Sequence, residues 1–587
     1  MINPTGQKIE LTYRLSEPSV NHRSLQWELV EVVDSIANHP MRAAQSNIIE
    51  IKYDSAYYDN YEKTDYGYAH VRIVLNKEKV KDEYYYNTSF LQNGELREDL
   101  LTDNNGNKYI RNIHGLRYRD IVSGDEHNGE NGCDDANTRV AEDGYWTEYY
   151  EKEKDPQIVT RYTVQYDELH NMVEYAEYGD VAVPDDDWRQ EVTYLPNTAN
   201  NMISLPKEER VFGAGQLLRS AFVNYSGYGE PAHINFEDNN QGIVATTHLR
   251  YDNFGNIVAI IAPEDVNNEN NWSAFEYDSV TFSNVVAIYN PFKAITRTEY
   301  DYSWGVPIRT IDPAGNEMRF KYDYKGRLST VLSPIELEHG KEYTVKYEYN
   351  LINHNLKMPV KYPYTYVVKD MFDSLFVQRQ VAIYDGYGRM MQKKHFAEVN
   401  GQDEWVVDGT EEWDAFGRAI MQGYPFVAQK NPHEYEPMNN TQAIIHYVYD
   451  VLDRPVEQTN ADGKQKTMYY HFHKDMKGVN RFLTQVTDEN KIIISTLKSP
   501  QNWLIQQVAG DQSITFFEYS PIGELLRTTD AEGYQTTYKY DMLGRLICRT
   551  HPDAGKTRMK YDLAGNLIGK QTANLGVTGE EIKYIYK

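Results

Sequence analysis

The chain has 587 residues, enough for several ordinary domains or for one long repeat array. Hydrophobic residues make up 40% of it, which excludes wholesale disorder. Its 60 basic and 87 acidic residues give a net charge of −27, and this charge makes nucleic acid and anionic membrane surfaces poor partners because both are negatively charged.

The first 150 residues show the alternation of strands without a clean repeat, and we predict a β region there that continues into the rest of the chain. Trp27–Ala37 is the one segment that favours a short helix. Two segments are rich in oxygen ligands, 103–107 and 125–135. Neither has the ligand spacing of an EF-hand, so turn chemistry explains them better than calcium.

Targeting signals are missing from the segments where they would be expected. The N-terminus has neither a basic region nor an apolar core of the kind found in signal peptides. The longest apolar run, Ile257–Ala262, is far too short to span a bilayer, so no direct membrane insertion is expected. The chain is therefore either cytosolic or part of a longer exported protein, and we favour the second interpretation.

A repeat dominates residues 151–587, which we interpret as one β-shell segment. Its unit is Tyr-Asp-x-x-Gly followed by Arg or Asn, and the cleanest copies, at Tyr519, Tyr540 and Tyr561, lie about 21 residues apart. The turn residues of the clear copies are Tyr251, Asp252 and Gly255; Tyr322, Asp323 and Gly326; Tyr384, Asp385 and Gly388; Trp413, Asp414 and Gly417; Tyr540, Asp541 and Gly544; and Tyr561, Asp562 and Gly565.

Each unit predicts a hairpin. Alternating residues such as Thr557, Met559 and Tyr561 would share one strand face. The aspartate can cap a tight turn with its carboxylate, and the glycine can adopt the left-handed conformation that a type I turn with a bulge requires. Gly401, in contrast, is expected to lie in a tolerant inserted loop.

Tyrosine is unusually frequent, with 50 Tyr against 18 Phe. Such rings suit half-buried strands, where the ring packs and the hydroxyl remains in contact with water. We expect mainly packing between successive hairpins, and the alternative is that exposed rings stack on sugars. The sequence thus predicts an all-β fold, a long antiparallel sheet of hairpins.

These residues resemble the Rhs/YD-repeat family, in particular its SpvB-like and Tc-toxin B-component branch. The resemblance rests on the repeat itself and on longer strings, which are DYGYAHVRI (65–73), NGNKYI (105–110), and the segments 300–327, 449–463 and 547–567. It implies a sheet that spirals into part of a hollow shell around a polypeptide. The chain departs from the family in lacking its self-cleaving Asp-Pro core motif, because Asp312-Pro313 reads as an ordinary turn.

No constellation of residues supports catalysis or cofactor binding. Gly555-Lys556-Thr557 resembles the end of a phosphate loop but lacks its first glycine and the following helix. His471 and His473 share a strand face without a third metal ligand in sequence. The repeated aspartates recur at one turn position, as capping demands and as a unique active site would not. We therefore expect no enzyme, no cofactor and no metal.

The expected function is a structural shell segment of a secreted bacterial Rhs/Tc-type toxin-delivery protein. Its expected partners are an enclosed toxin or effector polypeptide and the remaining shell segments, and not nucleic acid. The alternative is a secreted or cell-surface adhesion or carbohydrate-binding protein, as the teneurin branch of the family suggests.

Overall fold

The computed structural model describes most of the chain as strands connected in sequence order. The residues that it describes are 7–15, 27–36, 47–59, 63–88, 93–120, 126–127, 138–238, 243–263, 271–350, 365–373, 376–384, 388–414, 416–429, 431–436, 438 and 443–586. The segment 125–135 lies outside them except for Glu126 and His127, and so does Asp385. Within these ranges, no helix is long and apolar enough to cross a membrane.

The first of two antiparallel sheets has 29 strands. We call it the first coil. Its strands are β1 (Gln7–Leu15), β2 (Trp27–Ile36), β3 (Asn47–Asp59), β4 (Thr64–Leu75), β5 (Lys79–Tyr85), β6 (Leu96–Asp103), β7 (Lys108–Asp120), β8 (Glu126–His127), β9 (Thr138–Tyr149), β10 (Ile158–Tyr166), β11 (Met172–Asp180), β12 (Trp188–Tyr194), β13 (Pro206–Gly213), β14 (Gln216–Tyr225), β15 (Pro231–Asp238), β16 (Ile243–Tyr251), β17 (Ile257–Ile261), β18 (Trp272–Tyr277), β19 (Val285–Tyr289), β20 (Ile295–Asp301), β21 (Val306–Ile311), β22 (Glu317–Tyr322), β23 (Leu328–Leu332), β24 (Val345–Asn350), β25 (Thr365–Asp373), β26 (Phe376–Tyr384), β27 (Met390–Val399), β28 (Gln402–Asp408) and β31 (Phe426–Val427).

The second sheet has 15 strands and is called the second coil. Its strands are β29 (Glu411–Trp413), β30 (Ala419–Gly423), β32 (Ile444–Tyr449), β33 (Pro455–Thr459), β34 (Gln465–Lys474), β35 (Asn480–Thr487), β36 (Ile493–Lys498), β37 (Leu504–Val508), β38 (Ile514–Tyr519), β39 (Leu525–Thr529), β40 (Gln535–Tyr540), β41 (Leu546–His551), β42 (Gly555–Tyr561), β43 (Leu567–Gln571) and β44 (Ile582–Lys583). Two short helices, α1 (Pro334–Glu338) and α2 (Ala573–Thr578), complete the α-helical and β elements of the described residues.

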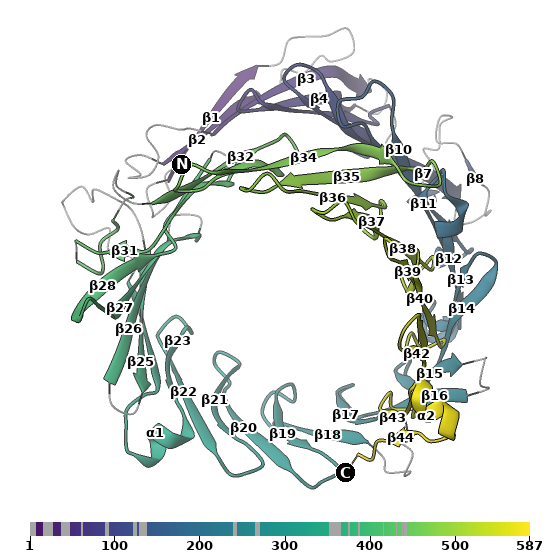
Figure 1. Ribbon diagram of the computed structural model, residues 1–587, viewed down its shortest axis with the longest axis vertical. Helices are drawn as coiled ribbons and strands as arrows, with labels where there is room; N and C mark the ends of the chain where they lie inside the picture. The colour runs from purple at the N-terminus through teal and green to yellow at the C-terminus, as the bar shows by residue number, and fades with distance from the viewer. Residues whose placement is uncertain are drawn as a thin grey trace.

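The coils wind around one axis. In Figure 1 the first coil forms a ring from β1 to β28, and the second coil follows the inside of that ring from β32 to β44. The predicted all-β fold is confirmed. The predicted helix at Trp27–Ala37 is wrong, because residues 27–36 form β2, which pairs with both β1 and β3. Strand pairing continues across residue 150 through β9 and β10 and changes sheet between β28 and β29.

Where the chain changes sheet, a small hydrophobic core forms. Its buried members are Val368, Val381, Ile383, Met391, Trp413 and Tyr435. The segment that carries Tyr435 is fixed beside this core by Gln392, whose side-chain amide donates to the Glu436 carbonyl (2.8 Å) and accepts from the Glu436 N–H (3.0 Å). Both groups are buried, so this pairing satisfies an amide that would otherwise be costly to bury.

The repeat turn has one recurring set of hydrogen bonds. In the copy at Asp541, one carboxylate oxygen accepts from the backbone N–H groups of Leu543 (3.0 Å) and Arg545 (2.9 Å). The other oxygen accepts from the Arg545 guanidinium at 2.6 Å. The residue after the glycine therefore holds the aspartate from the side chain as well as from the backbone, which explains why Arg or Asn occupies that position.

The same pattern recurs in both coils, with Arg or Asn as the second donor. It joins Asp103 to Asn107, Asp167 to Asn171, Asp252 to Asn256, Asp312 to Asn316, Asp323 to Arg327, Asp414 to Arg418, Asp450 to Arg454 and Asp562 to Asn566. At Asp252, the Asn256 side chain and then the backbone N–H groups of the turn lower the pKa of the carboxyl, because they bond its charged form.

The repeat tyrosine links neighbouring hairpins. Its hydroxyl donates to a backbone carbonyl in the preceding hairpin, near the start of the strand that follows the turn of that hairpin, at 2.7–3.1 Å. The donor–acceptor pairs are Tyr194–Met172, Tyr225–Pro206, Tyr251–Pro231, Tyr277–Ile257, Tyr300–Val285, Tyr322–Pro307, Tyr349–Leu328, Tyr449–Ala419, Tyr470–Pro455, Tyr561–Leu546 and Tyr586–Leu567. These hydroxyls donate to backbone carbonyls of the protein, which explains the preference for Tyr over Phe.

The turn glycines have positive φ, as at Gly255, Gly326, Gly388, Gly417, Gly544 and Gly565. The tyrosines that come directly before the glycine turns stand at a register shift in their strand pairs, as between Lys560 and Tyr561 and between Lys539 and Tyr540. Gly401 differs from its expectation. Its φ is +79°, because it closes the tight β27–β28 turn, so it is no tolerant control.

We predict that Gly565→Ala destabilises the protein by about 1 kcal/mol, because φ at Gly565 is +92° and an alanine there is strained. Gly227→Ala is the matched control. An added Cβ meets no atom within 4 Å at either glycine, and only Gly565 has a positive φ. Urea denaturation of both variants checks the prediction, and equal midpoints would contradict it.

Candidate functional site: the seam between the coils

The two edges of the coiled ribbon differ. We call the edge formed by the turns that follow the repeat tyrosine positions the tyrosine edge, for example Asp252–Asn256 and Asp541–Arg545. The opposite edge, formed by the intervening turns such as Lys77–Glu78 and Glu151–Gln157, is the return edge. Strands alternate in direction, so successive turns alternate between these edges. The tyrosine edge of the second coil lies against the return edge of the first, and we call this contact the seam.

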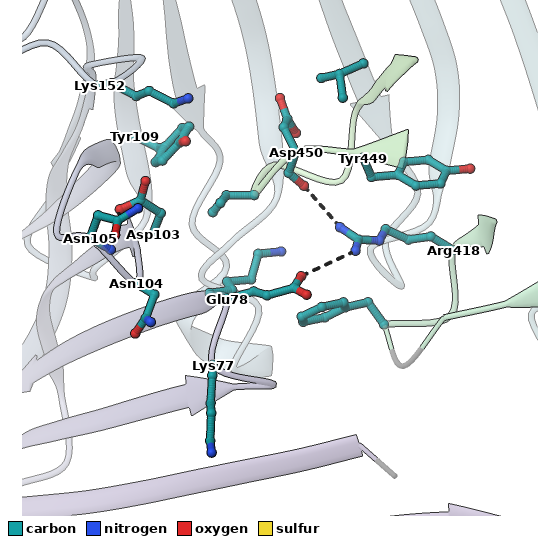
Figure 2. A pocket seen from close by; sticks show the side chains of 14 residues that line it. Lys77, Glu78, Asp103, Asn104, Asn105, Tyr109, Lys152, Arg418, Tyr449 and Asp450 are labelled. Carbon is teal, nitrogen blue, oxygen red and sulfur yellow. Dashed lines mark hydrogen bonds and ion pairs between the residues drawn. The ribbon is translucent and has the colours of Figure 1, made fainter. Parts of the chain in front are cut away.

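At one end of the seam, a cavity of about 500 Å³ lies between the coils (Figure 2). Lys77, Glu78 and Asp103–Asn105 border it from the first coil, and Arg418 and Asp450 border it from the second. Arg418 donates to the Asp450 carbonyl at 3.0 Å and lies 3.9 Å from the Glu78 carboxylate. Lys79 forms an ion pair with Asp453 at 2.8 Å and lies 5.7 Å from the centre of the Phe416 ring.

One ionic contact of the seam is a two-point pair. Both terminal nitrogens of the Arg454 guanidinium donate to the Glu151 carboxylate, at 2.6 and 2.8 Å. Arg454 also bonds its own turn aspartate, Asp450, and its guanidinium lies 4.2 Å from the centre of the Tyr470 ring. The Glu151 side chain is only 8% exposed, so its charge depends on this partner.

Farther along, the coils approach closely at glycines. A Cβ on Gly213 would lie 2.8 Å from the Pro521 side chain, and one on Gly179 would collide with the Gln501 amide. Arg219 pairs with Glu524 at 2.5 Å across the same seam. Because glycine has no side chain, the two turns can approach closely here, where larger residues would hold the coils apart.

Asp186 and Gln501 meet across the seam in an unusual way. The Gln501 amide donates to one Asp186 carboxylate oxygen at 2.9 Å. The other oxygen of Asp186 and the carbonyl oxygen of Gln501 are buried, and neither has a hydrogen-bond partner among the described residues. Both are acceptors while Asp186 is ionised. A proton on Asp186 would turn one of its carboxylate oxygens into a hydrogen-bond donor.

The surroundings of Asp186 favour that proton. Burial, with a smaller contribution from the carboxylates of Asp180 and Asp187, raises the pKa of Asp186 to about 6, although the Gln501 bond and the Asp180 N–H act in the opposite direction. The Asp180 carboxylate is in turn influenced by Arg481 and Asp475 of the second coil. Asp186 thus titrates within the seam itself.

The residues predicted from the sequence lie on both coils, and only some of them are at the seam. The turns of Asp414, Asp541 and Asp562 lie on the tyrosine edge of the second coil, whereas those of Asp252 and Asp323 lie on the tyrosine edge of the first. Gly555-Lys556-Thr557 begins strand β42. His471 and His473 belong to β34, beside a cavity of about 330 Å³ that Glu153 also borders, with the His471 Nε2 atom 3.6 Å from the Glu153 carboxylate.

Sequence reasoning missed Glu151, Asp186, Gln501 and Arg219. The arginine after the turn glycine was a visible signal for one half of the Arg454–Glu151 pair, but its partner is 303 residues away. Nothing in the local pattern distinguishes Asp186 from Asp185 and Asp187 on either side. These residues acquire their role only when the second coil returns beside the first.

Comparisons with known proteins agree with this architecture. Residues 519–556 match the model of the RHS repeat family. A search of curated proteins finds no sequence match. The crystal structure of TcdB2-TccC3 superposes with a TM-score of 0.76 at 13% identity, covering 97% of this chain and 39% of that one.

Two further solved structures give similar values. TcdB2-TccC3 without its hypervariable C-terminal region has a TM-score of 0.75 at 13% identity, and the Tc holotoxin pore of Photorhabdus luminescens has 0.75 at 12%. Each covers 97% of this chain, and this chain spans 41% of each. The chain thus has the fold of these Tc-toxin components over well under half of their length.

We predict that Glu151→Gln destabilises the protein by about 2 kcal/mol, because it removes the carboxylate partner of the Arg454 guanidinium. Glu153→Gln, in the same turn, should cost less than about 0.5 kcal/mol, because Glu153 is half exposed. Denaturant unfolding of the two variants gives both values. An equal effect at the two sites would show that the two-point pair contributes nothing specific.

A second prediction concerns pH. Because the pKa of Asp186 is raised on folding, its contribution to stability is complete below about pH 4 and is lost as the pH rises through about 6. We expect the seam to weaken by roughly 2–3 kcal/mol over that interval. Asp186→Asn keeps a donor facing Gln501 at every pH and should remove this dependence.

Asp185→Asn is the control, because Asp185 is exposed and lies next to Asp186. Hydrogen exchange of the backbone amides of Asp180 and Trp503 follows the seam directly, and the exchange rates are corrected for intrinsic pH dependence. A wild-type pH profile that Asp186→Asn leaves unchanged would show that another group titrates there.

Proposed function

Because the chain carries an RHS repeat and shares the fold of Tc-toxin components, we propose that it is a structural segment of a secreted, Rhs/Tc-type toxin-delivery shell that encloses a polypeptide cargo. The observation that carries this proposal is the seam. Two coils of one ribbon are locked together by buried ionic and amide pairs, and a wall built in this way can surround a space (Figure 1).

A mechanical role also accounts for where the conspicuous side chains are used. The repeat aspartates bond their own turns, and the repeat tyrosine hydroxyls bond backbone carbonyls of the preceding hairpins. These carboxylates and hydroxyls are occupied in holding the wall, which leaves them unsuited to acid–base chemistry. We therefore propose that the chain acts without catalysis, and that the enclosed polypeptide and the remaining shell segments are its partners.

The test uses the chain within its complete reading frame, with an unfolded reporter polypeptide placed where the cargo is expected. A closed wall should lengthen the lifetime of the reporter under added protease at least about tenfold. Glu151→Gln, which opens the seam, should shorten it, and Glu153→Gln should not. A reporter that is degraded at the same rate with and without the wall contradicts enclosure.

The same preparations serve to test inertness. Peptide, glycoside and nucleotide substrates should show no turnover. A measured activity that is lost on changing one carboxylate, while the fold survives, would instead identify an enzyme.

A further inference from the structure

The tyrosine edge of the first coil carries a row of exposed hydrophobic side chains at its turn tips. Its members come from successive turns between β10 and β23, and we call them the aromatic edge. They are Leu169, Leu195, Tyr228, Phe254, Val280, Phe282, Tyr302, Trp304 and Tyr324. Tyr228 is 84% exposed and Tyr324 is 82% exposed. Large rings in such positions are unfavourable in water and indicate an interaction surface.

This row is held in place before any partner arrives. The rings of Phe254 and Phe282 stack with their centres 4.5 Å apart, although they belong to different hairpins. The Asn256 side chain also bonds the Phe282 carbonyl at 2.7 Å, which ties the same two turns together. Trp304 lies against Gly326 of the next turn, where a Cβ would be 2.6 Å from its ring. A preorganised surface loses little entropy on binding.

The molecule itself shows what covers such an edge. In the second coil the equivalent turn tips include Phe416, Pro521 and Met542. Phe416 borders the seam cavity beside Lys79, Pro521 approaches Gly213, and Met542 is only 6% exposed. Among the described turn tips of that edge, Met476 is the one large hydrophobic side chain that is exposed. A tyrosine edge is thus covered by a return edge.

The second coil has a return edge of this kind that remains exposed. Its turns include Asp488–Ile492 and Asp530–Tyr534, where Ile492, Ile493 and Tyr534 are exposed. The hairpins of this edge follow the same repeat as those of the first coil. The two surfaces therefore match in spacing as well as in apolar character.

We propose that the aromatic edge of one molecule docks on the return edge of the second coil of another copy of this chain. The contact is the seam repeated between molecules. It is heterologous, because two different edges meet, so a molecule can use both of its edges at once. This goes beyond enclosure, since it concerns how walls stack on one another.

The net charge of −27 opposes binding to an anionic bilayer, which exposed Tyr and Trp tips could otherwise suit, but it also repels a second copy, so the choice of a second copy rests on the way the seam already joins these two kinds of edge. The wild-type chain should self-associate with rising concentration in sedimentation velocity experiments. Tyr228→Ser/Tyr324→Ser should weaken this association at least about tenfold, because it removes the two most exposed aromatic side chains of the edge. Both side chains are almost fully exposed, so the fold should survive.

Tyr469→Ser is the matched control, because Tyr469 is 54% exposed on a strand face away from both edges. A mixing experiment then tests the head-to-tail geometry. Tyr534→Ser damages the return edge and Tyr228→Ser/Tyr324→Ser the aromatic edge, so each variant alone should associate weakly. Their mixture should form one-to-one dimers and nothing larger, because each dimer joins one intact edge of each kind.

Three results would overturn the proposal. One is a chain that stays monomeric up to about 100 μM. Another is association that the double tyrosine variant leaves unchanged. The third is loss of binding to phosphatidylcholine–phosphatidylserine vesicles in that variant without any self-association, which would assign the edge to membranes. Protection of the reporter by the closed wall is measured separately, so failure of either idea leaves the other standing.

Discussion

An aspartate at the start of a turn needs several hydrogen-bond donors within a few residues, and the rest of this structure depends on how that need is met. At Asp541 two backbone N–H groups and the Arg545 guanidinium supply them. The glycine between adopts positive φ, and the bulge that results fixes the register of the next strand. The tyrosine hydroxyl then bonds the neighbouring hairpin, so each turn is fixed relative to the hairpin before it.

A ribbon built in this way has two unlike edges. Capped aspartates occur on both edges, as at Asp252 and Asp312. One edge carries the turns that follow the tyrosine, many with apolar tips, and the other carries the intervening turns, which in the first coil are mainly polar where they meet the seam. This difference gives the coil a direction. When the second coil returns beside the first, unlike edges meet, and the arginine that caps a turn can also reach a glutamate of the other coil, as Arg454 reaches Glu151.

The buried polar groups of the seam differ in how completely they are hydrogen-bonded. The Arg454–Glu151 pair is satisfied at both ends, and so it holds the coils without leaving a buried charge unpaired. Asp186 and Gln501 share one hydrogen bond, and each keeps an oxygen that is buried without a partner among the described residues. Glycines at 179 and 213 are needed simply because the two turns lie so close. A fully paired ionic contact and a titratable carboxylate thus lie in successive turns of one interface.

The amino-acid sequence by itself determined the hairpin and its repetition. The positions of Tyr561, Asp562 and Gly565 specify strand, turn and register through contacts within a few residues, and such contacts can be inferred from spacing alone. The same reasoning failed at Trp27–Ile36, where pairing with β1 and β3 outweighs a weak helical pattern. Tertiary structure alone decided the partners of Arg454 and Asp186 and the exposure of Tyr228 and Tyr324. These depend on where the ribbon lies after a full turn of some 300 residues, and that position is the sum of the small twist added at every strand.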